Sequence, residues 1–180
     1  GDIVHAQIKL NALLEEAARP HKGRDVLVDV RAMKHATSEA TDMPNLNRSP
    51  EIIHALGAFI ENATSFADTE VLVEAIWSER IITITVSDDG PGFSPSVLPK
   101  LGEPYISERS SAHAGGGDMG LGFFIAKTLI EQSGGEVATF NKPEPGHGAV
   151  VRLRWHRSDI EAETTWTAHE NGLNDFESEK

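Results

Sequence analysis

The chain contains no cysteine, few aromatic residues and no long hydrophobic run. The absence of cysteine excludes a disulfide framework and any thiol-based metal or redox site. No stretch approaches the ~18 consecutive apolar residues that a membrane-spanning helix needs. The N-terminus, "GDIVHAQIKL", has neither a basic start nor a long apolar run, so it predicts no signal peptide. Together these absences favour a cytoplasmic location.

Basic residues are also scarce, because 16 lysines and arginines stand against 28 acids and leave a net charge of −12. This balance argues against nucleic acid as a partner. The charge is uneven, since residues 158–180 contain seven acids and one lysine and so carry −6, half of the total. We expect these residues to form a solvated, disordered tail.

The length of the chain suits a single domain. Its 180 residues, 39% of them hydrophobic, fit one domain of roughly 150 residues plus appendages. Apolar residues at helical spacing predict three helices, over residues 4–18, 49–67 and 120–135. Alternating runs predict one strand and two hairpins, at residues 26–30, 71–87 and 136–155. The order of these elements favours an α+β fold, with helices stacked on one face of a mixed sheet.

Two glycine-rich segments are candidates for a binding site. The segment "SDDGPGF", residues 87–93, follows a predicted strand, although Asp-Gly also marks a plain hairpin turn. The segment "GGGDMG", residues 115–120, matches the dinucleotide fingerprint but lacks the strand that should precede it. It opens a helix, where bare backbone amides favour phosphate. No G-x-S-x-G, Walker lysine or H-E-x-x-H motif is present.

Three features follow one another along the chain: Asn62 on the polar side of a helix, an Asp-x-Gly-x-Gly turn, and glycines opening another helix. In this order they resemble the ATP-binding Bergerat fold shared by histidine kinases, gyrase B, Hsp90 and MutL. The boxes of the histidine-kinase branch are similar to "FIENA", "DDGPGF", "LGEPYIS" and "GDMGLGFFIAKTLIEQSGG". The runs "LLEEAARPHKGR" and "RSPEIIHAL" look most like the redox-responsive RegB/PrrB (ActS) sensor kinases. The resemblance covers about residues 13–156.

The resemblance implies a two-layer sandwich in which a mixed, mostly antiparallel sheet carries helices on one face and an ATP lid loop. Residues 21–157 would form this catalytic domain, residues 1–20 would be a linker helix from a dimerisation domain, and residues 158–180 the acidic tail. The domain would present ATP for phosphoryl transfer to a histidine on that dimerisation domain. A response regulator would act downstream, and the full-length protein would be a homodimer anchored in the membrane.

The resemblance also implies roles for individual residues. Asp88 would accept a hydrogen bond from the adenine amino group, and Gly90 and Gly92 would let the backbone pass close to the base. Asp89 would be only a turn residue. Asn62 would coordinate Mg²⁺, which bridges the phosphates.

Further ATP contacts are expected from the lid, residues 104–119, and from the helix after it. These candidates are Arg109, Gly117, Gly120, Leu121 and Gly122.

The sequence departs from the family pattern at three positions. Ala58 stands where a second asparagine is usual, Ser65 where lysine is frequent, and Asp118 where glycine is frequent. Two alternatives therefore stay open: a degenerate domain that binds nucleotide weakly and docks partners, and an ATPase of the gyrase or Hsp90 type. Ala58 speaks against the second, because those ATPases place a catalytic glutamate there. No histidine has the His-acid-x-x-x-Pro setting of a phosphoacceptor, so the acceptor is expected on another domain.

Overall fold

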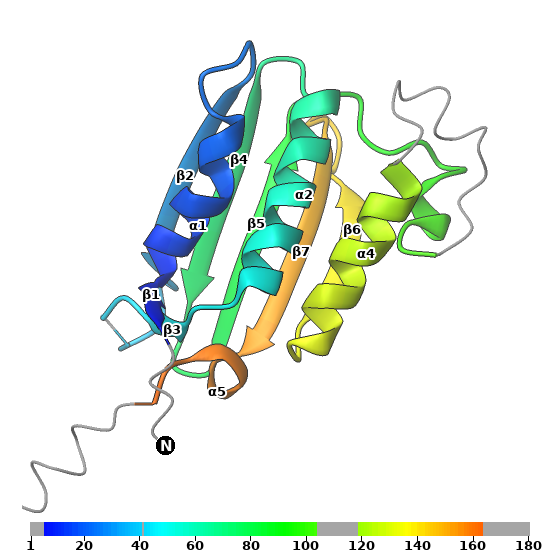
Figure 1. Ribbon diagram of the computed structural model, residues 1–180. Coiled ribbons are helices and arrows are strands. Elements are labelled where there is room, and N and C mark those ends of the chain that lie inside the picture. The colour runs from blue at the N-terminus through cyan, green and yellow to red at the C-terminus, as the bar shows by residue number, and fades with distance from the viewer. Residues whose placement is uncertain (1–5, 41, 104–118, 164–180) are drawn as a thin grey trace, which may run out of the picture.

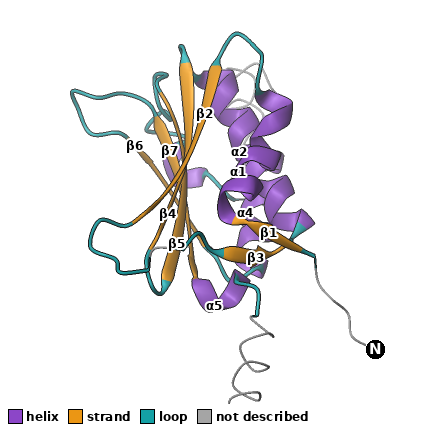
Figure 2. Cartoon of the chain, turned by 90° about the vertical axis from the view of Figure 1, so that its left-hand side faces the viewer, coloured by secondary structure: helices purple, strands orange, loops and turns teal. Residues whose placement is uncertain are grey.

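A computed structural model describes residues 6–40, 42–103 and 119–163 of the chain (Figure 1). Its main sheet contains five strands in the order β2 (Leu27–Lys34), β4 (Glu70–Trp77), β5 (Ile81–Asp88), β7 (Ala149–His156) and β6 (Glu136–Asn141). Only β2 and β4 are parallel, and the other neighbours are antiparallel. Figure 2 shows the helices gathered on one face of this sheet. The predicted α+β architecture is confirmed.

Three helices form the second layer: α1 (Leu10–Ala18), α2 (Pro50–Phe66) and α4 (Met119–Gln132). Local signals explain why α2 begins where it does. The Ser49 hydroxyl accepts a hydrogen bond of 3.2 Å from the Ile52 backbone N–H, and Pro50 occupies the first turn. The shorter helical turns are η1 (Arg19–His21), η2 (Leu98–Lys100) and α5 (Arg157–Ile160). None of the helices among the described residues combines the length and the apolarity that crossing a membrane requires.

The hydrophobic core lies between the sheet and the helices. Strand β5 alternates strictly, so Ile82, Ile84 and Val86 point inward and are buried. Helix α2 buries one face against them, and it meets α4 through the rings of Phe59 and Phe123, which pack edge-on with centroids 5.1 Å apart. This contact sets α2 and α4 side by side at the end of the domain that carries the glycine-rich motifs.

The N-terminal segment is packed as part of the domain. Residues 7–9 form strand β1 (Gln7–Lys9), which pairs antiparallel with β3 (Asn45–Asn47), so the predicted helix begins only at Leu10. The Leu10, Leu13 and Leu14 side chains of α1 are at most 1% exposed. A linker role for residues 1–20 stays a prediction, but the described part of this range contributes directly to the core.

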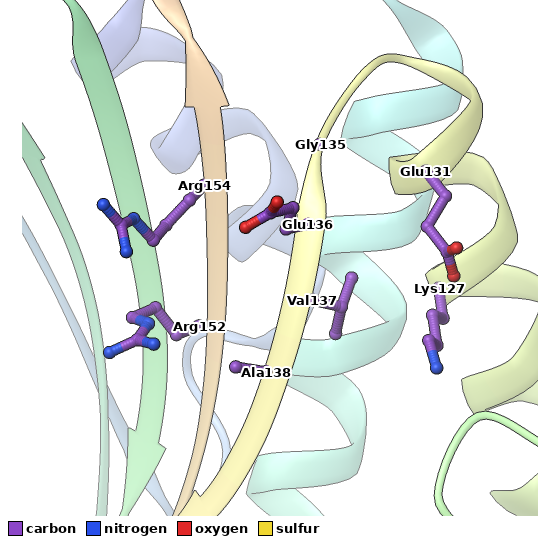
Figure 3. A pocket seen from close by; sticks show the side chains of 8 residues that line it. All are labelled: Lys127, Glu131, Gly135, Glu136, Val137, Ala138, Arg152 and Arg154. Carbon is purple, nitrogen blue, oxygen red and sulfur yellow. The ribbon is translucent and has the colours of Figure 1, made fainter.

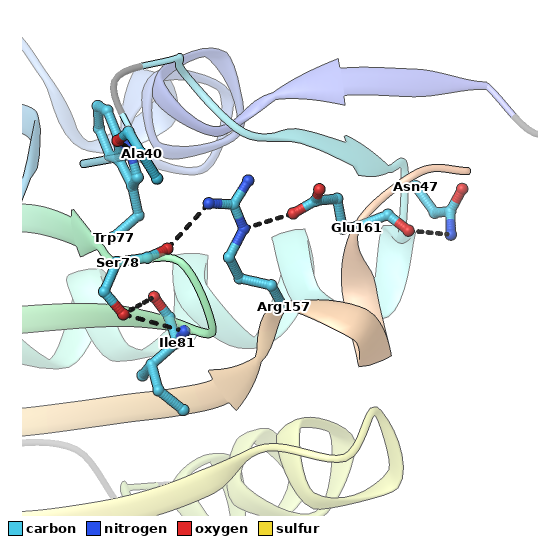
Figure 4. Close-up of polar contacts among 7 residues, drawn as sticks. All are labelled: Ala40, Asn47, Trp77, Ser78, Ile81, Arg157 and Glu161. Atoms are coloured by element: carbon cyan, nitrogen blue, oxygen red, sulfur yellow. Dashed lines mark hydrogen bonds and ion pairs between the residues drawn. The ribbon is translucent and has the colours of Figure 1, made fainter. Parts of the chain in front are cut away.

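Residues 157–161 connect the β4–β5 turn to strand β3 by hydrogen bonds (Figure 4). The Arg157 guanidinium donates 2.8 Å to the Ser78 carbonyl in the β4–β5 turn and 2.5 Å to the Glu161 carboxylate. The Asn47 amide donates to the Glu161 carbonyl at 3.5 Å. The predicted acidic tail thus starts, over residues 158–163, within packed structure, and residues 164–180 lie outside the described residues.

Replacing Arg157 by alanine should lower the free energy of unfolding by about 1–3 kcal/mol, because a charged hydrogen bond to a partly buried carbonyl is lost. The matched control is Arg31→Ala. Arg31 also pairs with an acid, Asp29, but its side chain is 58% exposed against 15% for Arg157. We expect the control to change stability by less than about 0.5 kcal/mol. Urea denaturation measures both, and equal midpoints for the two variants would contradict this account of the C-terminal segment.

Candidate functional site

A hollow at the end of β5 brings the two principal candidate residues together. It lies between the C-terminal half of α2, the ends of β5 and β7, and the turn after β5. Its free volume is about 10 Å³, room for one water molecule, so a larger ligand requires its walls to move apart. Both Asn62 and Asp88 line it, although they come from different elements. The remaining walls are mainly apolar and comprise Phe59, Ala63, Phe66, Val86, Phe93, Ala149 and Val151.

Asp88 is the buried charged residue of this hollow. The alternation of β5 turns Asp88 inward, and it is only 3% exposed. One oxygen, Oδ1, accepts backbone hydrogen bonds from Gly90 at 2.9 Å and Ala149 at 3.2 Å. Oδ2 receives no hydrogen bond from the described residues. Burial raises the pKa of the Asp88 carboxyl, and the two backbone N–H groups oppose that rise. The unsatisfied oxygen can therefore accept a donor from a ligand.

Two glycines are required by close backbone packing around Asp88. A Cβ on Gly90 would lie 2.0 Å from the Phe66 carbonyl oxygen at the end of α2. Gly148 has φ +127°, and a Cβ there would lie 1.8 Å from the Asp88 carbonyl oxygen. The turn is thus wedged between α2 and the β6–β7 hairpin. The proximity of Gly90 to a bound base stays a prediction.

The β6–β7 hairpin holds the turn by side-chain hydrogen bonds that sequence reasoning missed. The Asn141 amide accepts from the Phe93 N–H and donates to the Phe93 carbonyl, each at 2.8 Å. The His147 ring donates from Nδ1 to the Gly90 carbonyl at 3.1 Å. Gly92 passes so close that a Cβ would meet the Asn141 oxygen at 2.7 Å, and its φ is +81°. These partners lie about 50 residues away in sequence, so no local signal points to them.

The prediction that Asp89 is only a turn residue is wrong. Its carboxylate accepts the backbone N–H groups of Asp68 at 2.9 Å, Thr69 at 2.9 Å and Glu70 at 3.1 Å. The Thr69 hydroxyl also donates to it. These bonds, led by those from Thr69, hold the pKa of the Asp89 carboxyl far below its usual range. Asp89 thereby joins the turn after β5 to the loop between α2 and β4.

Asn62 lies half-buried in the same hollow, on α2, and its amide forms no hydrogen bond among the described residues. Ala58, one turn earlier, offers no polar atom. The Ser65 hydroxyl donates back to the Glu61 carbonyl at 3.1 Å and is therefore engaged with its own helix. Among the described residues no group of three or more His, Cys, Asp or Glu side chains is placed to hold a metal ion. The Asn62 side-chain oxygen is thus the uncharged oxygen ligand that this hollow offers to a metal ion.

The start of α4 supplies the remaining described candidates. Gly120 is buried, and the Leu121 side chain is 58% exposed. A Cβ on Gly122 would have no neighbour within 4 Å, so packing among the described residues does not require glycine there. Arg109 and Gly117, which were also predicted to contact ATP, lie outside the described residues.

A second hollow lies beside the edge strand β6 (Figure 3). Arg152 and Arg154 extend over one side of β7, whereas Lys127 and Glu131 project from α4 on the other side of β6. The charged groups therefore do not converge on one point, and neither Asn62 nor Asp88 is among the lining residues. The hollow at Asp88 is far smaller, but it is the better candidate for a functional site because it brings Asn62 to a buried carboxylate whose pKa is raised.

Comparison with known proteins decides the family. Residues 47–159 match the model of the histidine kinase-, DNA gyrase B-, and HSP90-like ATPases. The chain belongs to this ATPase family. It is 35% identical over 168 residues to the sensor histidine kinase RegB of Cereibacter sphaeroides, which covers 86% of this chain and 36% of RegB. It is 33% identical over 99 residues to the sensor histidine kinase CpxA of Escherichia coli, covering 55% of this chain and 22% of CpxA. The chain thus spans about a third of the length of RegB.

Solved structures share the fold of this ATPase domain. The mycobacterial sensor histidine kinase MprB aligns with a TM-score of 0.64 at 14% identity, covering 85% of this chain and 97% of that one. The nucleotide-free catalytic domain of the histidine kinase ThkA aligns with a TM-score of 0.63 at 17% identity, covering 84% and 95%. The predicted resemblance to histidine-kinase catalytic domains is confirmed.

The buried Asp88 should make stability depend on pH. Because its folded-state pKa is raised, Asp88 contributes most to stability when protonated, and that contribution is lost as the pH rises through the folded-state pKa. Asp88→Asn keeps an acceptor for Gly90 and Ala149 without the charge. We expect its stability relative to wild type to increase with pH above the ordinary aspartate pKa of about 3.9. Urea denaturation at a series of pH values checks this, and a difference that does not change with pH would contradict it.

Proposed function

We propose that this chain binds Mg·ATP in the hollow at Asp88 and presents it to a phosphoacceptor histidine on a separate dimerisation domain, as the catalytic domain of a sensor histidine kinase. The observation that carries the proposal is the Asp88 carboxylate, which is 3% exposed. One of its oxygens is bonded by backbone N–H groups, and the other has no donor among the described residues. Membership of the ATPase family and similarity to RegB and CpxA support it.

We infer that Oδ2 of Asp88 recognises adenine by accepting a hydrogen bond from the base. The exocyclic amino group of adenine is a donor, and it would satisfy Oδ2 inside a hollow whose walls are otherwise mainly apolar. Guanine carries a carbonyl oxygen at the equivalent ring position, so it would place an acceptor against a carboxylate. A buried mismatch of this kind costs more than an exposed one, and it gives the site its preference for adenine. The aromatic rings of Phe66 and Phe93 would pack against the base.

The phosphates would lie toward Asn62 and the start of α4. Mg²⁺ prefers oxygen ligands and keeps several waters, so a single amide oxygen from Asn62, together with phosphate oxygens, suits it. When bound, the ion would neutralise charge on the phosphates. The free space around Gly122 would admit a phosphate close to the backbone amides at the helix N-terminus. Gly120 and Leu121 would contribute further backbone amides, and Arg109 and Gly117 of the lid would add their contacts.

The phosphoacceptor is expected on another domain, because phosphoryl transfer needs a nucleophile in line with the γ-phosphate, and no histidine of residues 6–40, 42–103 or 119–163 lines the hollow. Leu121 and Ile125, 58% and 43% exposed, lie one turn apart on α4 and offer an apolar surface beside the site. We propose that this surface faces the histidine-bearing dimerisation domain of the same kinase. The full-length protein would then be a membrane-anchored homodimer with its catalytic domain in the cytoplasm, and a response regulator would receive the phosphoryl group.

A second candidate function is a degenerate domain that binds nucleotide weakly and docks partners. Ala58 favours it, because its side chain packs against the core where a second metal ligand would be useful. Titration of the chain with ATP, with and without magnesium, separates the two. Binding that strengthens with magnesium supports the kinase domain, whereas weak binding that magnesium does not change, or no binding at all, supports the docking module.

Asp88→Asn should weaken ATP binding by roughly tenfold to a hundredfold, about 1–3 kcal/mol, because the amide can present a donor where an acceptor is needed. The matched control is Asp29→Asn, since the Asp29 side chain is 44% exposed and lies on β2. Isothermal titration calorimetry measures both variants. Unchanged affinity in a folded Asp88→Asn protein would refute the assignment of adenine to Asp88.

The isolated chain should bind ATP without phosphorylating itself. A dimerisation domain supplied in trans should become labelled, although slowly, because two untethered domains lose the effective concentration that a linker provides. Incubation with γ-labelled ATP, followed by tests for acid-labile phosphohistidine, checks both statements. Label on this chain alone would show that one of its eight histidines is an acceptor and would contradict the proposal.

A further inference from the structure

We propose that Asp89 is a positioning residue that fixes the spacing between the adenine side of the site, at Asp88, and the metal side, at Asn62. The inference rests on the proposed function and goes beyond it, because it assigns a role in ATP binding to a residue that need not touch the nucleotide. Its basis is the set of contacts that joins the turn after β5 to the end of α2.

The Asp89 carboxylate gathers three consecutive backbone N–H groups. Oδ1 lies 2.9 Å from the nitrogens of Asp68 and Thr69 and 3.1 Å from that of Glu70. Asp68 and Thr69 lie in the short loop after α2, which ends at Phe66, and Glu70 is the first residue of β4. Hydrogen bonds to an ionised carboxylate are stronger than neutral ones, and the lowered pKa of Asp89 agrees with an acid that is held in its charged form. The carboxylate therefore anchors the turn to the first residues after the helix.

The Asp89 carboxylate fixes the position of the turn relative to α2, and it takes no part in the hydrogen bonds that hold Asp88. Asp88 receives its own hydrogen bonds from Gly90 and Ala149, and neither bond involves Asp89. The hairpin side of the turn is held independently through Asn141. What Asp89 adds is the link toward α2, where Asn62 lies about one turn before the helix ends. The Phe66 carbonyl already abuts Gly90 with no space for a side chain, so the link is short and direct.

Weakening the Asp89 contacts should change the affinity of ligands that reach both Asp88 and Asn62 more than the affinity of ligands that reach Asp88 alone. Adenosine would contact mainly the Asp88 side, whereas Mg·ATP must reach Asp88 and Asn62 at once. A ligand that bridges two subsites gains affinity only when their spacing matches its own length. Loosening the link should therefore weaken Mg·ATP and leave adenosine nearly unaffected. A residue that merely stabilised the fold would produce no such split in the folded protein.

The experiment compares Asp89→Ala and Asp89→Asn with wild type in the complete 180-residue chain, at a temperature well below unfolding. The control is Asp68→Asn, because the Asp68 side chain is exposed and carries no hydrogen bond among the described residues. Ligand-observed NMR for adenosine and calorimetry for Mg·ATP give the dissociation constants. We expect Asp89→Ala to lose about tenfold or more for Mg·ATP and less than about threefold for adenosine. Asp89→Asn keeps one acceptor and should recover part of the loss.

Equal losses for the two ligands, or no loss for Mg·ATP, would overturn the inference. If Asp89→Ala does not fold, Asp89→Asn and Thr69→Val, which removes one donor to the carboxylate, must show the same split between ligands on a smaller scale, and its absence counts against the role. Failure of wild type to bind ATP would defeat the proposed function and this inference together. Wild-type binding with an unchanged Asp89→Ala variant would defeat this inference alone.

Discussion

A buried carboxylate at the end of β5 is the constraint on which the rest of the site depends. Asp88 is 3% exposed, and a charge removed from water to that extent is costly unless its oxygens receive donors. The part of the chain that the structure describes supplies two donors, both backbone N–H groups and both to the same oxygen. The glycines at positions 90 and 148 allow the two chain segments to approach closely enough to provide them. The second oxygen then defines what a ligand must bring, which is a hydrogen-bond donor.

Two adjacent aspartates have opposite environments because Asp88 is the last residue of β5 and shares its buried face, whereas Asp89 begins the turn that follows the strand. Asp88 points into the hollow, where burial raises its pKa. Asp89 points toward the loop after α2, where several donors lower its pKa. The first can bind a ligand donor and the second holds the backbone, so one dipeptide links the hollow at Asp88 to the helix that carries Asn62. The same residue type therefore performs two functions through its surroundings alone.

Sequence reasoning succeeded where the signals are local. Ser49 and Pro50 placed the start of α2 within a residue, and apolar alternation placed β5 directly before the glycine-rich turn. It failed where pairing is distant. Within the range predicted as the N-terminal helix, residues 7–9 instead form a strand, because Gln7–Lys9 pairs with Asn45–Asn47. The contacts of Asn141, His147 and Asp89 also join residues about 20 to 60 positions apart, and no periodicity reports them.

The proposed function depends on recognition of the adenine base of ATP by Oδ2 of Asp88. A crystal structure of the chain with magnesium and a non-hydrolysable ATP analogue tests this contact. We expect the exocyclic amino nitrogen of adenine to lie about 2.7–3.2 Å from Oδ2 of Asp88, while Oδ1 keeps its bonds to Gly90 and Ala149. An analogue bound elsewhere, or in this hollow with its amino group directed away from Asp88, would contradict the account.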